Sequence, residues 1–140
     1  MTGFGEQNKS QGKRNKKNKI SNKQIINQAI NFHIQGNILE AEKYYQYVIN
    51  QGVKDHRVFL NQASILRHLG KFKEVEVSLR KAIELNPNYV DAHLNLGSIL
   101  RDLGNLKDAE LYTRKAIKLD PNCANANANL GSILRDLGNL

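Results

Sequence analysis

Four asparagines recur at intervals of 34 residues and carry a side chain suited to holding a peptide backbone. They are Asn27, Asn61, Asn95 and Asn129. An amide side chain offers a donor and an acceptor together, so each can pair with the C=O and the N–H of a bound peptide. A row of such amides can hold an extended chain without reading its sequence. The same spacing also fits a structural role, in which the amides form bonds between helices, and the sequence leaves both roles open.

Serine and arginine repeat at the same interval. The serines stand three residues and the arginines six residues after the last three asparagines, at Ser64, Ser98, Ser132, Arg67, Arg101 and Arg135. On a helix these offsets share approximately one face. Because a guanidinium grips carboxylates and phosphates with a planar fork, three in register favour an acidic ligand segment or a chain terminus. Asp102 and Asp136 directly follow two of the arginines, so salt bridging or a solvated rim is the structural alternative.

Catalytic and phosphate-binding motifs find no support in the sequence. No G-x-x-x-x-G-K-[ST], G-x-G-x-x-G or H-E-x-x-H occurs. The four histidines keep no ligand-like spacing, and the single Cys123 has no partner for a disulfide or a metal site. Acidic pairs such as Glu40 and Glu42 stand at the start of predicted helices, where negative charge suits the helix dipole. We therefore expect no enzyme activity, cofactor or metal in these residues, and any catalytic domain would follow beyond Leu140.

Charge divides the chain into a basic leader and a nearly balanced remainder. The net charge is +8, and residues 1–20 carry six Lys/Arg against Glu6 alone. Because that stretch is polar and almost free of branched apolar residues, it cannot bury enough surface to offset its chain entropy. We expect a disordered basic tail over residues 1–20, which either aids solubility or binds nucleic acid or anionic membrane. No signal-like or membrane-spanning apolar run occurs, so we expect a soluble, cytoplasmic protein.

Glycine has the same period and divides the remaining chain into helix pairs. It recurs at Gly36, Gly70, Gly104 and Gly138, and the twelve residues 95–106 return unchanged as residues 129–140. A period of this size indicates stacked repeats. Ser21 and Gln24 predict a capping box that starts the first helix near Asn22. Apolar spacing predicts later helices over 57–69, 72–85, 89–103 and 106–119.

Proline closes two of the predicted helix pairs, at Pro87 and Pro121. Proline lacks the N–H that a helix interior needs, but it suits the turn into the next helix. Asparagine follows each proline, at Asn88 and Asn122. Since asparagine is a favoured N-cap, we expect these two side chains to cap the helices that follow.

The residues resemble the tetratricopeptide repeat family, which pairs two antiparallel helices in 34 residues. The resemblance covers residues 22–140 and is fullest at Leu94, Asn95, Leu96, Gly97, Gly104, Ala109, Tyr112, Ala116 and Pro121. It implies an all-α solenoid of antiparallel helix pairs whose first helices line a concave face. Small residues such as Gly97 and Ala109 would let neighbouring helices approach closely. Where the family usually has a bulky aromatic residue, this chain has His93 and Asn127, so we expect a weakened fourth repeat.

The period sets the expected boundaries of the array. We expect it to span residues 21–140, with repeats at about 22–55, 56–89 and 90–123 and a half repeat at 124–140. The half repeat leaves the leucines of its helix without a partner helix. We therefore expect a fragment of a longer protein, or an exposed end that self-associates.

The leading hypothesis is a protein-interaction scaffold that binds an extended peptide or protein segment on the concave face. In it the asparagines hold the backbone and the arginines hold acidic groups. A second hypothesis makes the chain the substrate-presenting fragment of a larger transferase, because the asparagine spacing also resembles repeat arrays that precede sugar-transferase domains. A third assigns nucleic-acid or membrane binding to the basic tail.

One specialised binding mode of the family does not fit this chain. Some members hold a C-terminal carboxylate with a lysine one residue before the asparagine. Here that place holds Ile26, Leu60 and Leu94. We therefore do not expect a clamp for chaperone tails of that kind.

Overall fold

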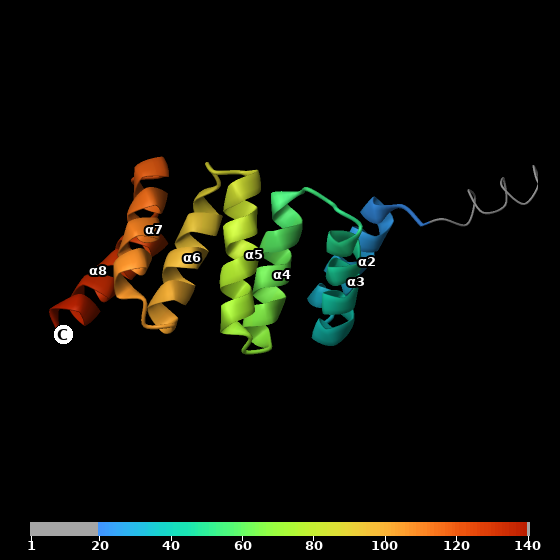
Figure 1. The fold of residues 1–140 in the computed structure, drawn as a ribbon, viewed down its shortest axis with the longest axis horizontal. Coiled ribbons are helices and arrows are strands. Elements are labelled where there is room, and N and C mark those ends of the chain that lie inside the picture. Colours follow the sequence, from blue (N-terminus) through green and yellow to red (C-terminus); the bar gives the residue numbers. More distant parts are fainter. Residues whose placement is uncertain (1–19, 140) are drawn as a thin grey trace, which may run out of the picture.

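The structure, a computed structural model, describes residues 20–139, and these form seven α-helices and no β-strand. The helices are α2 (Asn22–Ile34), α3 (Ile38–Asn50), α4 (His56–His68), α5 (Phe72–Leu85), α6 (Val90–Asp102), α7 (Leu106–Leu119) and α8 (Ala124–Gly138). They stand side by side along the molecule, from α2 and α3 at one end to α8 at the other (Figure 1). The tail predicted at residues 1–20 lies outside the described residues, apart from Ile20.

The first helix begins where the capping signal predicts. The Ser21 hydroxyl accepts from the Gln24 backbone N–H at 3.2 Å, and the Gln24 side chain accepts from the Ser21 backbone N–H at 2.9 Å. This reciprocal pair satisfies two of the N–H groups that a helix start leaves without partners. The predicted capping box is therefore confirmed.

The predicted caps at Asn88 and Asn122 were wrong. The residues at the N-cap positions of α6 and α8 are Tyr89 and Cys123, and neither makes a side-chain cap. Asn88 donates its backbone N–H to the side chain of Asn86 at 3.3 Å, and Asn122 does the same to Asp120 at 3.1 Å. The side chain of the residue before each proline, Asn86 or Asp120, thus accepts from the backbone N–H two residues later and closes a local turn. The N-cap of the following helix therefore lies one residue further along the chain than the sequence predicts.

Three glycines make the tight turns within the helix pairs. Gly36, Gly70 and Gly104 have φ of +80°, +72° and +81°, in the left-handed region that glycine adopts without strain. The residue after each glycine donates its N–H to a carbonyl five residues back, as Asn105 does to Leu100 at 2.8 Å. The fourth glycine, Gly138, is the last residue of α8, and Asn139 is the C-cap of that helix.

Each helix packs mainly on its neighbours in the chain, which makes the described array an all-α solenoid. Helices α2 and α3, α4 and α5, and α6 and α7 form the pairs, and α3 packs on α4, α5 on α6 and α7 on α8 to join them. The predicted close approach at Gly97 is confirmed, because an added Cβ there would fall on Thr113 Oγ1 and lie 3.2 Å from Ala109 O. Function on such a fold lies along a surface shared by several repeats.

The joints between successive pairs differ in polarity. At the first joint Gln62, 7% exposed, donates to Gln46 at 3.1 Å and accepts from Ser78 at 2.9 Å. One repeat later the equivalent residue is Leu96, which is fully buried in an apolar cluster with Leu79 and others. At this position the first joint is therefore hydrogen-bonded and the second is apolar.

Two residues that depart from the family pattern hold turn carbonyls instead. His93 Nε2 lies 2.6 Å from Pro87 O, in position to donate, and Asn127 Nδ2 donates to Pro121 O at 3.2 Å. Asn127 is exposed and adds nothing to the core, as its polarity predicted. Both side chains nevertheless secure the turn that precedes their helix.

Candidate functional site

A groove lies between the first helices of two successive pairs, α4 and α6. Its volume is about 380 Å³, and its lining residues are Arg57, Leu60, Asn61, Tyr89, Asp91 and Asn95. A smaller cavity of about 130 Å³ adjoins it, lined by Leu60, Ala63, Ser64, Arg67, Val75, Leu79 and Asn95. Because Leu60 and Asn95 line both, we describe them together as the α4–α6 groove.

The four periodic asparagines do not share one environment. Asn61 and Asn95 are half-buried and line the α4–α6 groove. Asn129 is also half-buried, but its amide donates to Thr113 Oγ1 on α7 at 3.0 Å. Asn27 is exposed on α2 and lines neither cavity of the groove. The structure thus brings two of the four amides together at one groove and gives a third the structural role.

Asn61 lies beside a buried tyrosine of the preceding helix pair. Tyr45 is fully buried, and its hydroxyl makes no hydrogen bond with the described residues. Burial raises the pKa of Tyr45, and the nearby Asn61 side chain partly opposes that rise. The amide of Asn61 therefore lies close to the Tyr45 hydroxyl.

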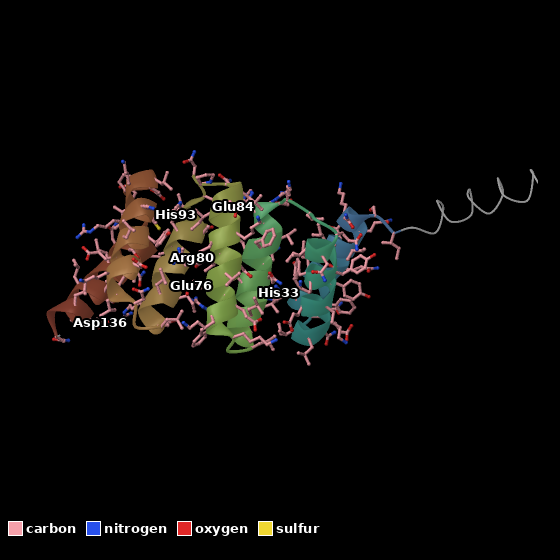
Figure 2. The ribbon with its side chains drawn as sticks, in the orientation of Figure 1. His33, Glu76, Arg80, Glu84, His93 and Asp136 are labelled. Atoms are coloured by element: carbon pink, nitrogen blue, oxygen red, sulfur yellow. The ribbon has the colours of Figure 1, made fainter. Side chains whose placement is uncertain are left out.

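Arg67 and Arg101 each pair with the aspartate of the next repeat, and Asp102, which directly follows Arg101, pairs with Arg67. Arg101 Nε lies 2.6 Å from Asp136 Oδ2, and this hydrogen bond raises the pKa of Arg101. Asp136 lies on α8 at the C-terminal end of the array (Figure 2). Arg67 is held more loosely, at 3.9 Å from Asp102 and 3.3 Å from the Ser98 hydroxyl. The predicted salt bridging occurs, but between helices.

Arg135 and the two remaining serines are less constrained. Arg135 is exposed and has no ion pair within residues 20–139. Ser64 is exposed and lines the α4–α6 groove, whereas Ser132 is half-buried on α8 and lines neither of its cavities. Of the predicted site residues, Asn61, Asn95, Ser64 and Arg67 therefore belong to the groove, and Ser98 bonds to Arg67 at its edge.

Sequence reasoning missed three polar or aromatic residues of the groove: Arg57, Tyr89 and Asp91. Arg57 bonds to Asp55 with Nη2–Oδ2 at 2.8 Å, and that bond lowers the pKa of Asp55. Arg57 and Asp91 each stand four residues before a groove asparagine, which places them on the same helix face. The sequence signal that could have identified them is this four-residue offset, which occurs in two successive repeats, with a positive charge at Arg57 and a negative charge at Asp91.

Clusters of metal-ligating side chains and membrane-spanning helices are both absent from the described part of the chain. Within it, no group of three His, Cys, Asp or Glu side chains lies close enough to hold a metal ion. None of its seven helices has both the length and the apolar character required to span a bilayer.

A second opening lies between α3 and α5, above Phe59 and Gln62 of α4. Its volume is about 510 Å³, and Val77, 69% exposed, stands at its edge. None of the predicted site residues lines it. It also lacks a pair of polar residues one repeat apart, which distinguishes it from the α4–α6 groove.

Comparison with known families and structures supports the repeat assignment. A family model described as "Tetratricopeptide repeat" matches residues 90–123, and a second, described as "TPR repeat", matches residues 63–104. Residues 63–123 of this chain therefore match tetratricopeptide repeats. No curated protein matches the chain.

Solved tetratricopeptide repeat structures share the fold of this chain. The first TPR of Spaghetti (RPAP3) bound to the HSP90 peptide SRMEEVD has a TM-score of 0.77 at 24% identity, covering 81% of this chain and 90% of that one. The second TPR domain of human RPAP3 with the HSP70 peptide SGPTIEEVD has a TM-score of 0.74 at 21% identity, covering 81% and 98%. YrrB, a TPR protein with an unusual peptide-binding site, has a TM-score of 0.79 at 22% identity, covering 85% and 61%.

Proposed function

We propose that this tetratricopeptide repeat array is a protein-interaction scaffold that binds an extended peptide segment in the α4–α6 groove. The observation that carries the proposal is that Asn61 and Asn95, one repeat apart, line the same groove. Asn95 makes no hydrogen bond with another described side chain, and Asn61 lies beside the Tyr45 hydroxyl. Each therefore keeps a donor and an acceptor for a peptide backbone.

The remaining groove residues define the chemistry of the segment. Leu60 and Tyr89 supply apolar surface between the two amides, which suits an aliphatic or aromatic side chain. Arg57 and Asp91 add one charge of each sign. The groove thus favours a segment of mixed character over a uniformly charged one.

An acidic residue in the segment would meet Arg67 more readily than Arg101. The Arg67 side chain is 41% exposed and lies 3.9 Å from its aspartate, whereas Arg101 is held at 2.6 Å. A loose, exposed ion pair is screened by water and contributes little to stability, so a ligand carboxylate can replace it. We expect one acidic residue at the Arg67 end of the groove.

The related structures support peptide binding in general and do not fix the ligand. The two RPAP3 domains hold acidic peptides that end in EEVD. In this chain Leu60 and Leu94 occupy the places where a carboxylate clamp of the family would have lysine. We therefore propose an internal segment as the ligand, with contacts to backbone in place of a terminal carboxylate.

Affinity selection from a library of twelve-residue peptides, followed by titration of the selected peptide, tests this proposal. Replacing both groove amides, Asn61→Ala with Asn95→Ala, removes backbone bonds of about 0.5–1.5 kcal/mol each, so binding should weaken about tenfold. Asn125→Ala, on the exposed first turn of α8, is the matched control and should leave affinity unchanged. Equal affinity of the double variant and the wild type, with helicity preserved, would show that the amides do not hold the ligand.

The transferase and basic-tail alternatives have no supporting observation within residues 20–139. The first depends on residues beyond Leu140. The second depends on residues outside the described range, and deleting residues 2–19 before an RNA or vesicle binding assay tests it. Binding that survives the deletion excludes the tail as the site.

A further inference from the structure

The cavity of about 510 Å³ between α3 and α5 is lined by a serine whose counterparts in two other repeats are tyrosines. We call this cavity the α3–α5 opening. Ser78 on α5 lines it, and the residues 34 positions before and after Ser78 are Tyr44 and Tyr112. The Ser78 hydroxyl donates to the buried Gln62 at 2.9 Å and does not fill the opening. A small side chain therefore stands where two repeats carry an aromatic ring.

The third repeat shows how a tyrosine ring is held at this position. The ring of Tyr112 stacks on that of His93, with centroids 6.1 Å apart and planes at 22°. Arg80 Nη1 donates to the Tyr112 hydroxyl at 3.0 Å, and Lys115 Nζ lies 4.7 Å from the ring centroid. Arg80 lies on α5 and His93 on α6, so the ring bridges two repeats (Figure 2). An aromatic neighbour, a hydrogen-bond donor and a cation thus hold it together.

The α3–α5 opening keeps the counterparts of all three neighbours. The residues 34 positions before Arg80, His93 and Lys115 line it, and they are Gln46, Phe59 and Lys81. Phe59 supplies an aromatic ring and Lys81 a cation. The Gln46 amide nitrogen donates to Asn50 at 2.8 Å and carries a second hydrogen for another acceptor. The surroundings of a tyrosine ring are therefore present without the ring.

We propose that the α3–α5 opening binds a tyrosine side chain of a partner polypeptide, in the place that the Tyr112 ring takes one repeat later. The ring packs against Phe59, its hydroxyl accepts from the Gln46 amide, and Lys81 lies at its face. The volume is within the range of roughly 300–1,000 Å³ that ligand pockets have. Val77, 69% exposed at the edge, offers apolar contact to the residue beside the tyrosine.

This site is separate from the α4–α6 groove. The two share no lining residue, because the opening uses Phe59 and Gln62 of α4 and the groove uses Leu60, Asn61 and others. The array would therefore present two binding surfaces, one that holds backbone and one that takes a single aromatic side chain. Failure of either proposal leaves the other intact.

Selection from a library of seven-residue peptides on the wild-type chain, followed by depletion on Ser78→Tyr, tests the proposal. Ser78→Tyr supplies the ring from the chain itself and closes the opening. We expect the peptides that bind only the wild type to share a tyrosine. Replacing that tyrosine with alanine should weaken binding about tenfold or more, and with phenylalanine about three- to tenfold, since only the hydroxyl bond is lost. A depleted pool that is empty, or that shares no aromatic residue, would overturn the proposal.

Two control variants locate the binding. Ser78→Ala removes the hydroxyl but leaves the opening, so it should bind the selected peptides as the wild type does. The Asn61→Ala, Asn95→Ala variant should also bind them unchanged. Loss of binding in that double variant would assign the peptides to the α4–α6 groove and overturn the proposal.

A probe without a peptide backbone gives an independent test. We expect 4-methylphenol, the side chain of tyrosine, to shift the amide resonances around Phe59 saturably, and Ser78→Tyr to abolish these shifts. Tyr112→Ser should open the equivalent place in the third repeat and add saturable shifts around His93. This gain does not depend on the folding of Ser78→Tyr, which circular dichroism checks. Absence of saturable shifts around both Phe59 in the wild type and His93 in Tyr112→Ser would overturn the proposal.

Discussion

Residues 95–106 and 129–140 have one sequence but two environments. On α6, Leu100 is 1% exposed; on α8, its counterpart Leu134 is 42% exposed. Helix α7 covers Leu100 in the first segment, and no described helix covers Leu134 in the second. Burial in this array is therefore a property of the interface between helices, and an identical stretch of sequence can contribute very different amounts to stability.

The glycines of the two segments differ in the same way. Gly97 touches α7, whereas Gly131 faces open space. Gly104 adopts φ +81° and turns the chain back, whereas α8 continues through Gly138. The turn at Gly104 brings α7 back against α6.

Leucine truncation should give the largest contrast. Leu100→Ala opens a cavity in the core and should lower the free energy of unfolding by about 2–5 kcal/mol. Leu134→Ala removes side-chain surface that is already partly in water, and its cost should stay below about 1 kcal/mol. Urea unfolding followed by circular dichroism at 222 nm measures both. Equal losses would mean that α8 is covered in solution.

Glycine-to-alanine substitution should have opposite signs in the two segments. Gly97→Ala forces Thr113 and α7 to shift, at about 1–3 kcal/mol. Gly131→Ala meets no neighbour and improves helix propensity, so it should stabilise the protein by up to about 1 kcal/mol. The same urea titrations decide the signs, and a destabilising Gly131→Ala would contradict the open environment assigned to α8.

Asparagine truncation should separate structure from binding. Asn129→Ala leaves Thr113 Oγ1 without its amide donor and should cost about 0.5–1.5 kcal/mol. Asn95→Ala breaks no bond within the described array, so it should leave stability nearly unchanged and weaken binding of the selected peptide. Thermal unfolding and peptide titration on the same two variants give both readouts. A loss of stability in Asn95→Ala equal to that in Asn129→Ala would exclude a free amide at Asn95.

Charge substitutions should give the smallest contrast. Asp136→Asn breaks the pair with Arg101 and should lower the urea midpoint slightly at low salt, with no difference left near 1 M salt. Arg135→Gln should leave the urea midpoint unchanged at low salt and near 1 M salt. Because the hydrogen bond with Asp136 raises the pKa of Arg101, the arginine stays charged throughout the neutral range and causes no pH dependence of stability there. A salt-independent effect of Asp136→Asn would point to packing in place of charge.

The helices could be predicted from sequence because their signals are local. Ser21 with Gln24, the apolar spacing and the periodic glycines each act within about one or two helical turns. The helix limits consequently agree with prediction to about a residue, as for α5 and α7. The error at Asn88 and Asn122 arose because the residue before each proline competes for the turn.

The groove could be predicted only in part, because partners across repeats depend on how helix pairs stack. Asn95 and Asn129 look equivalent in the sequence, yet sixteen residues earlier the first has Leu79 and the second has Thr113. Of these two residues only threonine can accept a hydrogen bond, so Asn129 bonds to the preceding helix and Asn95 does not. Likewise the partner of Arg101 stands 35 residues ahead and not beside it. These offsets follow from the packing of one pair on the next.

The contact of each helix with its chain neighbours has a mechanical consequence. A force that pulls the two ends of the array apart passes through every joint in series, because few contacts bypass a joint. The hydrogen-bonded joint around Gln62 and the apolar joint around Leu96 carry the same load but resist it differently. Stretching should therefore lengthen the molecule in discrete steps, one joint at a time, with the remaining pairs intact between steps.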